Sequence, residues 1–169
     1  KSVLTPSEDK TSATTMTLIL ADKAFEGHVG ADDRGSKFNG PYQFSGGVTA
    51  NSLLGSYDRT GLQGVVTSQT EELLFMNAFY DLPVNQEGTR LFFSGSVSDS
   101  EPGSSLKQFD VNGDSTSITL RLTHPFLRSR GKNLTAYLGF TGRNSTTKIL
   151  GSLDSEDRLR VATMGVSYD

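Results

Sequence analysis

The chain has 169 residues, with 16 Lys and Arg against 19 Asp and Glu and a formal net charge of −3. This balance lacks the basic surplus of nucleic-acid-binding proteins, so a nucleic-acid partner is not expected. Because Cys is absent, disulfides and thiolate metal sites are excluded. The sequence holds no run of about 18 apolar residues, the length of a transmembrane helix.

Apolar side chains are sparse but regularly placed. Hydrophobic residues make up 34% of the chain and Gly contributes 18 residues, yet apolar and polar residues alternate along most of it. Period two is the pattern of strands with one apolar and one polar face, and it argues against disorder. The composition therefore fits a sheet whose second face is polar.

The first residues differ from the rest. Residues 1–14 carry a Thr-Pro pair and a cluster of charges, which predicts a turn or a loose end. Residues 15–22 alternate and predict a short strand that precedes the main sheet.

Eight strands are predicted after residue 23, each about ten residues long, the length that a tilted strand needs to cross a bilayer. The clearest pair lies at 118–140, where two alternating runs flank a polar connector and predict an antiparallel hairpin. Helical spacing is not evident. The alternating runs are 25–32, 43–50, 62–67, 73–82, 90–97, 117–123, 134–141 and 159–168.

The predicted connectors also alternate. Those containing LLG (53–55), LPV (82–84) and HPF (124–126) begin with apolar residues and are expected to be tight. The intervening ones are polar or long: DDRGSKFNG (32–40), SQTEE (68–72), 98–117 and 142–157. Short turns at one end and longer loops at the other are typical of outer-membrane β-barrels, in which apolar residues contact lipid while Gln, Ser, Thr, Arg and His face a hydrated interior.

Three segments resemble one family, the transporter components of bacterial two-partner secretion. These transporters are the outer-membrane relatives of haemolysin and haemagglutinin activation proteins. They are FEGHVGADDRGSKFNGPYQFSGGVTANSLLGSYDRTGL (25–62), FYDLPVNQEGTRLFFSGSVS (79–98) and LRLTHPFLRSRGKNLTAYLGF (120–140). The resemblance covers residues 15–169.

The resemblance implies an all-β fold, an antiparallel up-and-down β-barrel of which about eight strands, half of a sixteen-stranded outer-membrane barrel, are present. Residues 1–23 would be the end of a periplasmic POTRA-type module or linker, and residues 24–169 the N-terminal part of the barrel. The Arg-containing sixth loop of the family has no counterpart here, so a fragment is expected. The turns at 53–58, 82–88 and 124–133 would be periplasmic.

No catalytic, cofactor or metal site is expected, and the chain is not predicted to be an enzyme. DVNGD (110–114) lacks the spacing of a calcium loop. His28 and His124 are far apart in the chain and have no evident carboxylate partner, and neither a nucleophile elbow nor a P-loop is present.

Five basic residues are the candidate contacts. Arg128, Arg130 and Lys132 form a cluster in a predicted turn, which suits a solvated turn or a contact with lipid phosphates or an unfolded substrate. Arg121 and Arg90 are expected in the lumen, where they line a polypeptide path or pair with a neighbouring acid.

The predicted function is thus secretion of a large adhesin or cytolysin partner through the outer membrane, with membrane lipid as a second partner and self-association of the fragment through open strand edges. The alternative is a soluble eight-stranded barrel or sandwich that binds a small ligand or a glycan and has an apolar interior.

Overall fold

The computed structural model describes residues 2–6, 14–18 and 23–169. Strands β1 (Ser2–Pro6) and β2 (Thr14–Leu18) pair antiparallel with each other. The turn or loose end expected over residues 1–14 is therefore wrong for Ser2–Pro6, because Pro6 is tolerated as the last residue of a two-stranded ladder. Of the strand expected over 15–22, residues 19–22 lie outside the described residues.

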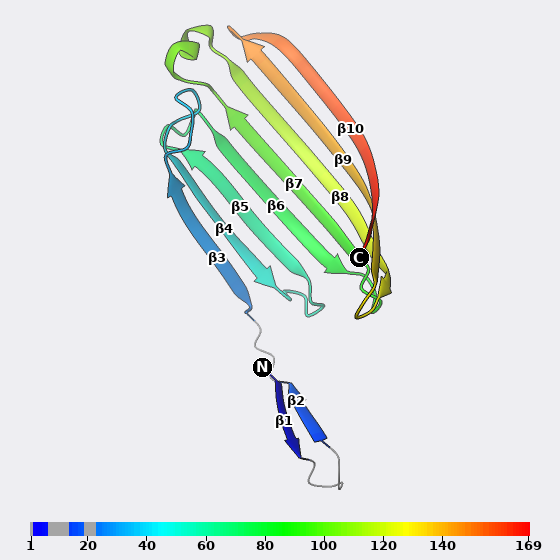
Figure 1. The fold of residues 1–169 in the computed structure, drawn as a ribbon. Helices are drawn as coiled ribbons and strands as arrows, with labels where there is room; N and C mark the ends of the chain where they lie inside the picture. The colour runs from blue at the N-terminus through cyan, green and yellow to red at the C-terminus, as the bar shows by residue number, and fades with distance from the viewer. Residues whose placement is uncertain (1, 7–13, 19–22) are drawn as a thin grey trace.

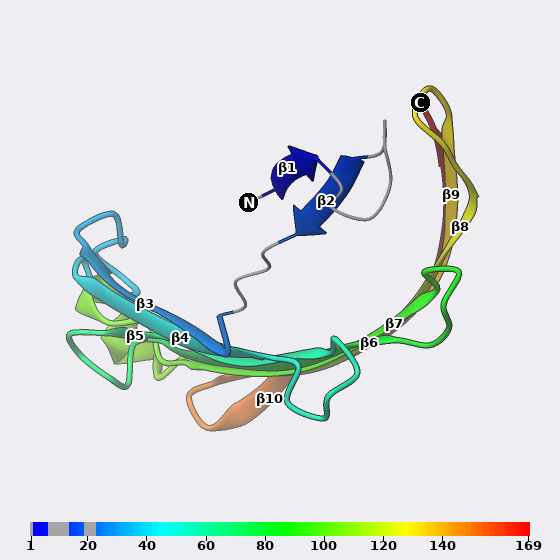
Figure 2. The same ribbon diagram turned by 90° about the horizontal axis from the view of Figure 1, so that it is seen from below.

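Eight further strands form one antiparallel sheet in the order β10-β9-β8-β7-β6-β5-β4-β3 (Figure 1). Each strand pairs with its neighbours in the chain, which confirms the predicted up-and-down topology and the eight strands after residue 23. Figure 2 shows that the sheet curves strongly from β3 to β10. The strands are β3 (Phe25–Asp32), β4 (Gln43–Asn51), β5 (Arg59–Thr67), β6 (Leu74–Pro83), β7 (Arg90–Ser100), β8 (Asn112–Arg128), β9 (Asn133–Ile149) and β10 (Ser152–Tyr168).

The last three strands are longer than predicted. Each has 17 residues, against 8 to 11 in the five strands before them. The polar segment 142–157, expected as a loop, is mostly a paired continuation of β9 and β10, and 98–117 is strand at both ends. Both faces of these extensions are polar, so the apolar alternation that marks a strand in sequence is lost although the backbone ladder continues.

Connectors alternate between the two ends of the sheet, as predicted, but the predicted difference in length is only partly confirmed: 33–42 and 101–111 are long, whereas 150–151 is a tight turn. We call the end with connectors 52–58, 84–89 and 129–132 the turn end, and the end with 33–42, 68–73, 101–111 and 150–151 the loop end. The turn expected over 124–133 is wrong in its first half, because β8 continues to Arg128 past a bulge between Pro125 and Leu127. A bulge accommodates the proline, which has no N–H for the ladder.

Segment 101–111 contains η1 (Ser104–Phe109), a 3₁₀ helix of 6 residues. Among residues 2–6, 14–18 and 23–169, no helix has the length and apolar character needed to span a membrane.

The pairing register sorts the strand residues into two faces. Cross-strand partners lie on the same face, so the row Phe25–Ala50–Thr60–Tyr80–Phe93–Leu120–Phe140–Ala162 belongs to one face of all eight strands. We call this the apolar face, and the opposite one the polar face. The apolar side chains are solvent-exposed in the chain alone, reaching 92% for Val29, 84% for Met164 and 72% for Val166. An apolar interior, as in the soluble alternative, is not what this sheet forms.

Crowding at glycines shows which face is concave. On the polar face, a Cβ added to Gly47, Gly61 or Gly165 would lie 2.5–2.6 Å from ring atoms of His28, Phe79 or Tyr137. On the apolar face, a Cβ added to Gly27, Gly46, Gly64 or Gly95 would meet nothing nearer than 3.3 Å. Side chains converge on the inside of a curved sheet and diverge on the outside. The polar face is therefore concave and the apolar face convex.

The apolar residues form a band that crosses the strands obliquely. From Phe44 in β4, the register leads across six strand pairs to Glu156 in β10, whereas the first apolar residue on that face of β10 is Ala162, six residues further. The band thus shifts by one residue per strand. A rise of about 3.3 Å per residue and a spacing of about 4.8 Å between strands give a tilt of about 35°, within the range of closed barrels.

One buried carboxylate organises the turn between β4 and β5. Asp58 is fully buried, and its carboxylate accepts hydrogen bonds from the backbone N–H groups of Leu54 at 3.1 Å and Ser56 at 3.4 Å. The turn needs this support because Ser52 and Tyr57 have φ values of 57° and 55°, which non-glycine residues rarely adopt.

We expect Leu138→Arg to impair membrane insertion of the full-length protein, because a charge on the lipid-facing side of a barrel at mid-depth costs about 2–4 kcal/mol. Thr141→Arg, on the polar face of the same strand, is the matched control and should insert normally. The measurement is the fraction of protein folded into lipid vesicles, scored by heat-modifiable gel mobility. Equal insertion of the two variants would contradict the assignment of the faces.

We expect Asp58→Ala to lower the free energy of unfolding by about 1–3 kcal/mol, because two backbone donors lose a buried acceptor. Urea unfolding in lipid vesicles measures this loss. Asp58→Asn keeps one side-chain oxygen as an acceptor and should lose less, so an equal loss in both variants would count against the hydrogen-bonding role.

Candidate functional site

The concave polar face carries the candidate site, and hydroxyl and amide groups cover its middle. Ser96 and Ser117 share a hydrogen bond of 2.8 Å between β7 and β8, and Thr119 and Thr141 share one of 3.3 Å between β8 and β9. Asn77 donates to the carbonyl of Gly95 at 3.2 Å. Short polar side chains bonded across neighbouring strands make a hydrated wall without one deep binding pocket.

Toward the turn end, the polar face becomes basic and aromatic. Asp81, Arg90, Phe92, Arg121 and Thr123 line an open cleft of about 250 Å³, which we call the mouth cleft. The register explains the assembly, because Phe92 is the cross-strand partner of both Asp81 and Arg121. The structure thus brings Arg90 and Arg121, two of the predicted candidates, to one place on the concave face.

The two arginines of the mouth cleft have different partners. Arg90 donates from Nε to Asp81 Oδ1 at 2.9 Å, with side chains 37% and 22% exposed. A partly exposed pair of this kind stabilises little but fixes the orientation of the guanidinium. Arg121 lies over the ring of Tyr137, at 5.2 Å from its centroid, a cation–π contact that leaves its charge without a carboxylate partner among the described residues.

Further cations lie at the same end. Arg128 is the last residue of β8, and Arg130 and Lys132 belong to the turn 129–132. All three are exposed, and none of them lines the mouth cleft. The turn is closed by Ser129, whose hydroxyl donates to the carbonyl of Lys132 at 2.9 Å. These cations thus project from the rim of the sheet.

Sequence reasoning missed part of the cleft and misplaced one residue. Asp81, Phe92 and Tyr137 join the two arginines only through the register between strands, which a single alternating run does not reveal. His124, expected in the hydrated interior, lies on the apolar face, in the row of Ala136. There Thr89 Oγ1 lies within hydrogen-bond distance of its Nδ1, at 2.7 Å, and the ring of Phe126 packs edge-on with its centroid 4.6 Å from that of the imidazole. The imidazole thus has a hydrogen-bond partner on the apolar face.

Solved structures share the fold. CdiB from Escherichia coli superposes with a TM-score of 0.81 at 22% identity, over 99% of this chain and 32% of that protein. CdiB from Acinetobacter baumannii gives a TM-score of 0.66 at 18% identity, over 99% of this chain and 33% of that one. Both likenesses concern the fold.

Sequence comparisons agree with the structural ones. The heme/hemopexin transporter protein HuxB of Haemophilus influenzae is 25% identical over 126 residues, which is 75% of this chain and 22% of HuxB, so the chain spans about a fifth of this curated relative. The family model for haemolysin secretion/activation proteins ShlB/FhaC/HecB matches residues 20–169. The chain therefore belongs to this family of two-partner secretion transporters of the Gram-negative outer membrane.

Proposed function

We propose that this sheet forms part of the wall of a passage through which a large secreted protein, an adhesin or a cytolysin, crosses the outer membrane. The observation that carries the proposal is the opposition of the two faces, with a hydrated concave face backed by an oblique apolar band. The band suits hydrocarbon, and the ladder between neighbouring strands satisfies the backbone within it. Residues of the concave face offer weak, exchangeable hydrogen bonds to a moving chain.

Transport along this wall is passive in our proposal and involves no enzyme activity. Cross-strand hydroxyl pairs such as Ser96 with Ser117 offer a passing backbone many donors and acceptors of similar strength. A path without one tight site lets an extended chain bind and leave repeatedly, as conduction through multi-site pores requires. No nucleotide, metal or cofactor takes part in the proposed step.

The loop end would face the exterior and the turn end the periplasm, because outer-membrane barrels carry their short turns on the periplasmic side. The mouth cleft then lies where an unfolded polypeptide enters. Arg121 is the proposed contact for carboxylates and carbonyls of that polypeptide, with Arg90 held by Asp81 beside it. Arg128, Arg130 and Lys132 would attract either the polypeptide or lipid phosphates at the rim.

Residues 1–23 are proposed to be the end of a periplasmic POTRA-type module or linker, with residues 24–169 as the N-terminal part of the barrel. The pairing of β1 with β2, apart from the eight-stranded sheet, supports this division, as does the start of the family match at residue 20.

Closure of the wall requires partners for its two outermost strands. Among the described residues, β3 and β10 each pair on one side only. Open edges do not persist in hydrocarbon, so we propose that they pair with additional strands of a longer barrel. In the isolated chain, we propose that the same edges pair with those of a second copy.

We expect Arg121→Gln in the full-length transporter to reduce secretion of its partner roughly threefold to tenfold, because one charge-assisted contact at the entrance is lost. Secreted partner is quantified in the medium against the amount of folded transporter in the outer membrane. Arg143→Gln is the matched control: Arg143 lies on the same face toward the loop end, where it donates to Ser115 at 2.9 Å. Unchanged secretion by Arg121→Gln, or an equal loss in the control, would contradict the role of the mouth cleft.

A further inference from the structure

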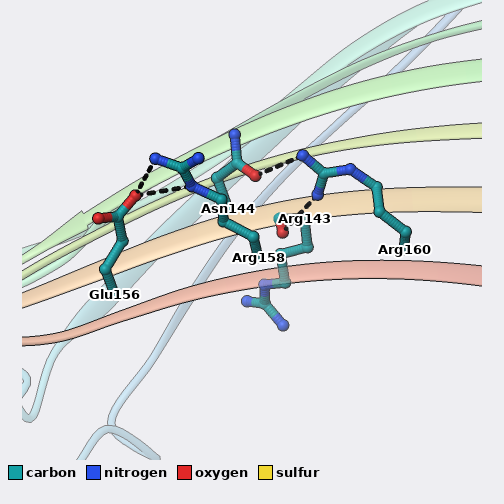
Figure 3. Close-up of polar contacts among 5 residues, drawn as sticks. All are labelled: Arg143, Asn144, Glu156, Arg158 and Arg160. Carbon is teal, nitrogen blue, oxygen red and sulfur yellow. Dashed lines mark hydrogen bonds and ion pairs between the residues drawn. The ribbon is translucent and has the colours of Figure 1, made fainter.

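Two arginines stand on the convex face directly beyond the apolar band. Arg158 and Arg160 belong to β10 and lie near Asn144 of β9 (Figure 3). Their cross-strand partners are Asn144 and Gly142, respectively. Arg160 lies two residues from Ala162, the first apolar residue of the band on this strand, or about 7 Å along it. In a barrel whose loop end faces outward, this depth is that of the lipid headgroups of the outer leaflet.

The guanidinium of Arg160 is oriented by neutral acceptors alone. Its Nη1 donates to the carbonyl of Arg143 at 3.1 Å and to that of Leu159 at 2.6 Å, and its Nη2 donates to Oδ1 of Asn144 at 2.9 Å. These bonds hold the group against the sheet without compensating its charge. A fixed, uncompensated guanidinium is suited to an oxyanion, which it can bind through two parallel N–H groups.

Arg158 adds a second cation at the same level. It forms an ion pair with Glu156 on the same strand, in which Nε and Nη2 lie 2.8 and 2.5 Å from Oε1, and its side chain remains 70% exposed. Glu156 lies one register row further from the band, together with Asp114. Glu156 thus offsets part of the charge of Arg158, whereas Arg160 has no carboxylate partner among the described residues, so an anion is favoured nearest to Arg160.

An open cleft joins Arg160 to the band. It measures about 210 Å³ and has the apolar side chains of Ile118 and Phe140 on the side of the band. Gly142 keeps the cleft free, since a Cβ there would stand 3.6 Å from Cδ of Arg160 and 3.7 Å from Cε1 of Phe140, within ordinary contact distance of both. The remaining lining residues are Thr116 and Asn144.

We propose that this surface binds a phosphorylated lipid of the outer leaflet, with its phosphate on Arg160 and Arg158 and an acyl chain along Ile118 and Phe140. An anionic lipid fits this cleft better than other partners do, because the cleft is shallow and lies on the convex face. Its lining also changes from apolar to basic over the distance that separates an acyl chain from its headgroup. The inference rests on the orientation given under Proposed function.

The test measures lipid binding by the full-length protein in detergent, by native mass spectrometry with diphosphoryl lipid A as the probe. Arg158→Gln with Arg160→Gln should weaken binding of lipid A about tenfold or more, as expected when charge-assisted contacts are lost. Gly142→Leu keeps both charges but fills the cleft, and should also weaken binding. Arg143→Gln, at the same level on the concave face, should leave it unchanged.

Four results would overturn the proposal. The first is equal binding by the double variant and the wild type, and the second is a loss in Arg143→Gln as large as in the double variant. The third is displacement of lipid A by inorganic phosphate at equal concentration, which would show that free anions suffice. Stronger binding of phosphatidylglycerol than of lipid A would assign the site to an inner-leaflet lipid and contradict the orientation. Secretion by Arg121→Gln is measured separately, so failure of the transport proposal can be distinguished from failure of the lipid site.

Discussion

Backbone hydrogen bonding is the constraint on which the rest of this structure depends. In hydrocarbon an unpaired N–H or C=O costs several kcal/mol, and an antiparallel meander pairs each strand with its chain neighbours. Once the ladder satisfies the backbone, side chains are free to divide between two environments. That freedom explains how a chain with only 34% hydrophobic residues forms an extended sheet in which Ala50 is the one buried apolar residue among those described.

The features predictable from sequence were those encoded within single strands. Alternation at Phe25–Asp32 or at Leu91–Val97 predicts one strand and its two faces. Whether a connector begins with apolar or polar residues predicts the end of the sheet at which it lies. The number of strands and the position of Arg90 and Arg121 on the polar face follow from such local signals, whereas the up-and-down order was implied by the family resemblance.

Features that depend on register were not predictable. The partner of Arg90 is Asp81, nine residues earlier in the chain, but only the alignment of β6 with β7 brings the two side chains together. His124 was predicted to face the lumen because its side chain is polar. It lies two residues after Leu122, however, so the alternation of the strand places it on the apolar face. The long extensions of β9 and β10 escaped prediction because polar residues occupy both of their faces.

The crowded glycines of the concave face have a consequence for the bore of the barrel. Phe79 lies across Gly61 and Tyr137 lies across Gly165, in the manner by which an aromatic ring covers a gap on a neighbouring strand. Each such pair lets two strands fold toward each other where bulkier residues would hold them flat. Individual strand pairs thus determine the local curvature of the sheet, and these local bends together set the width of the barrel.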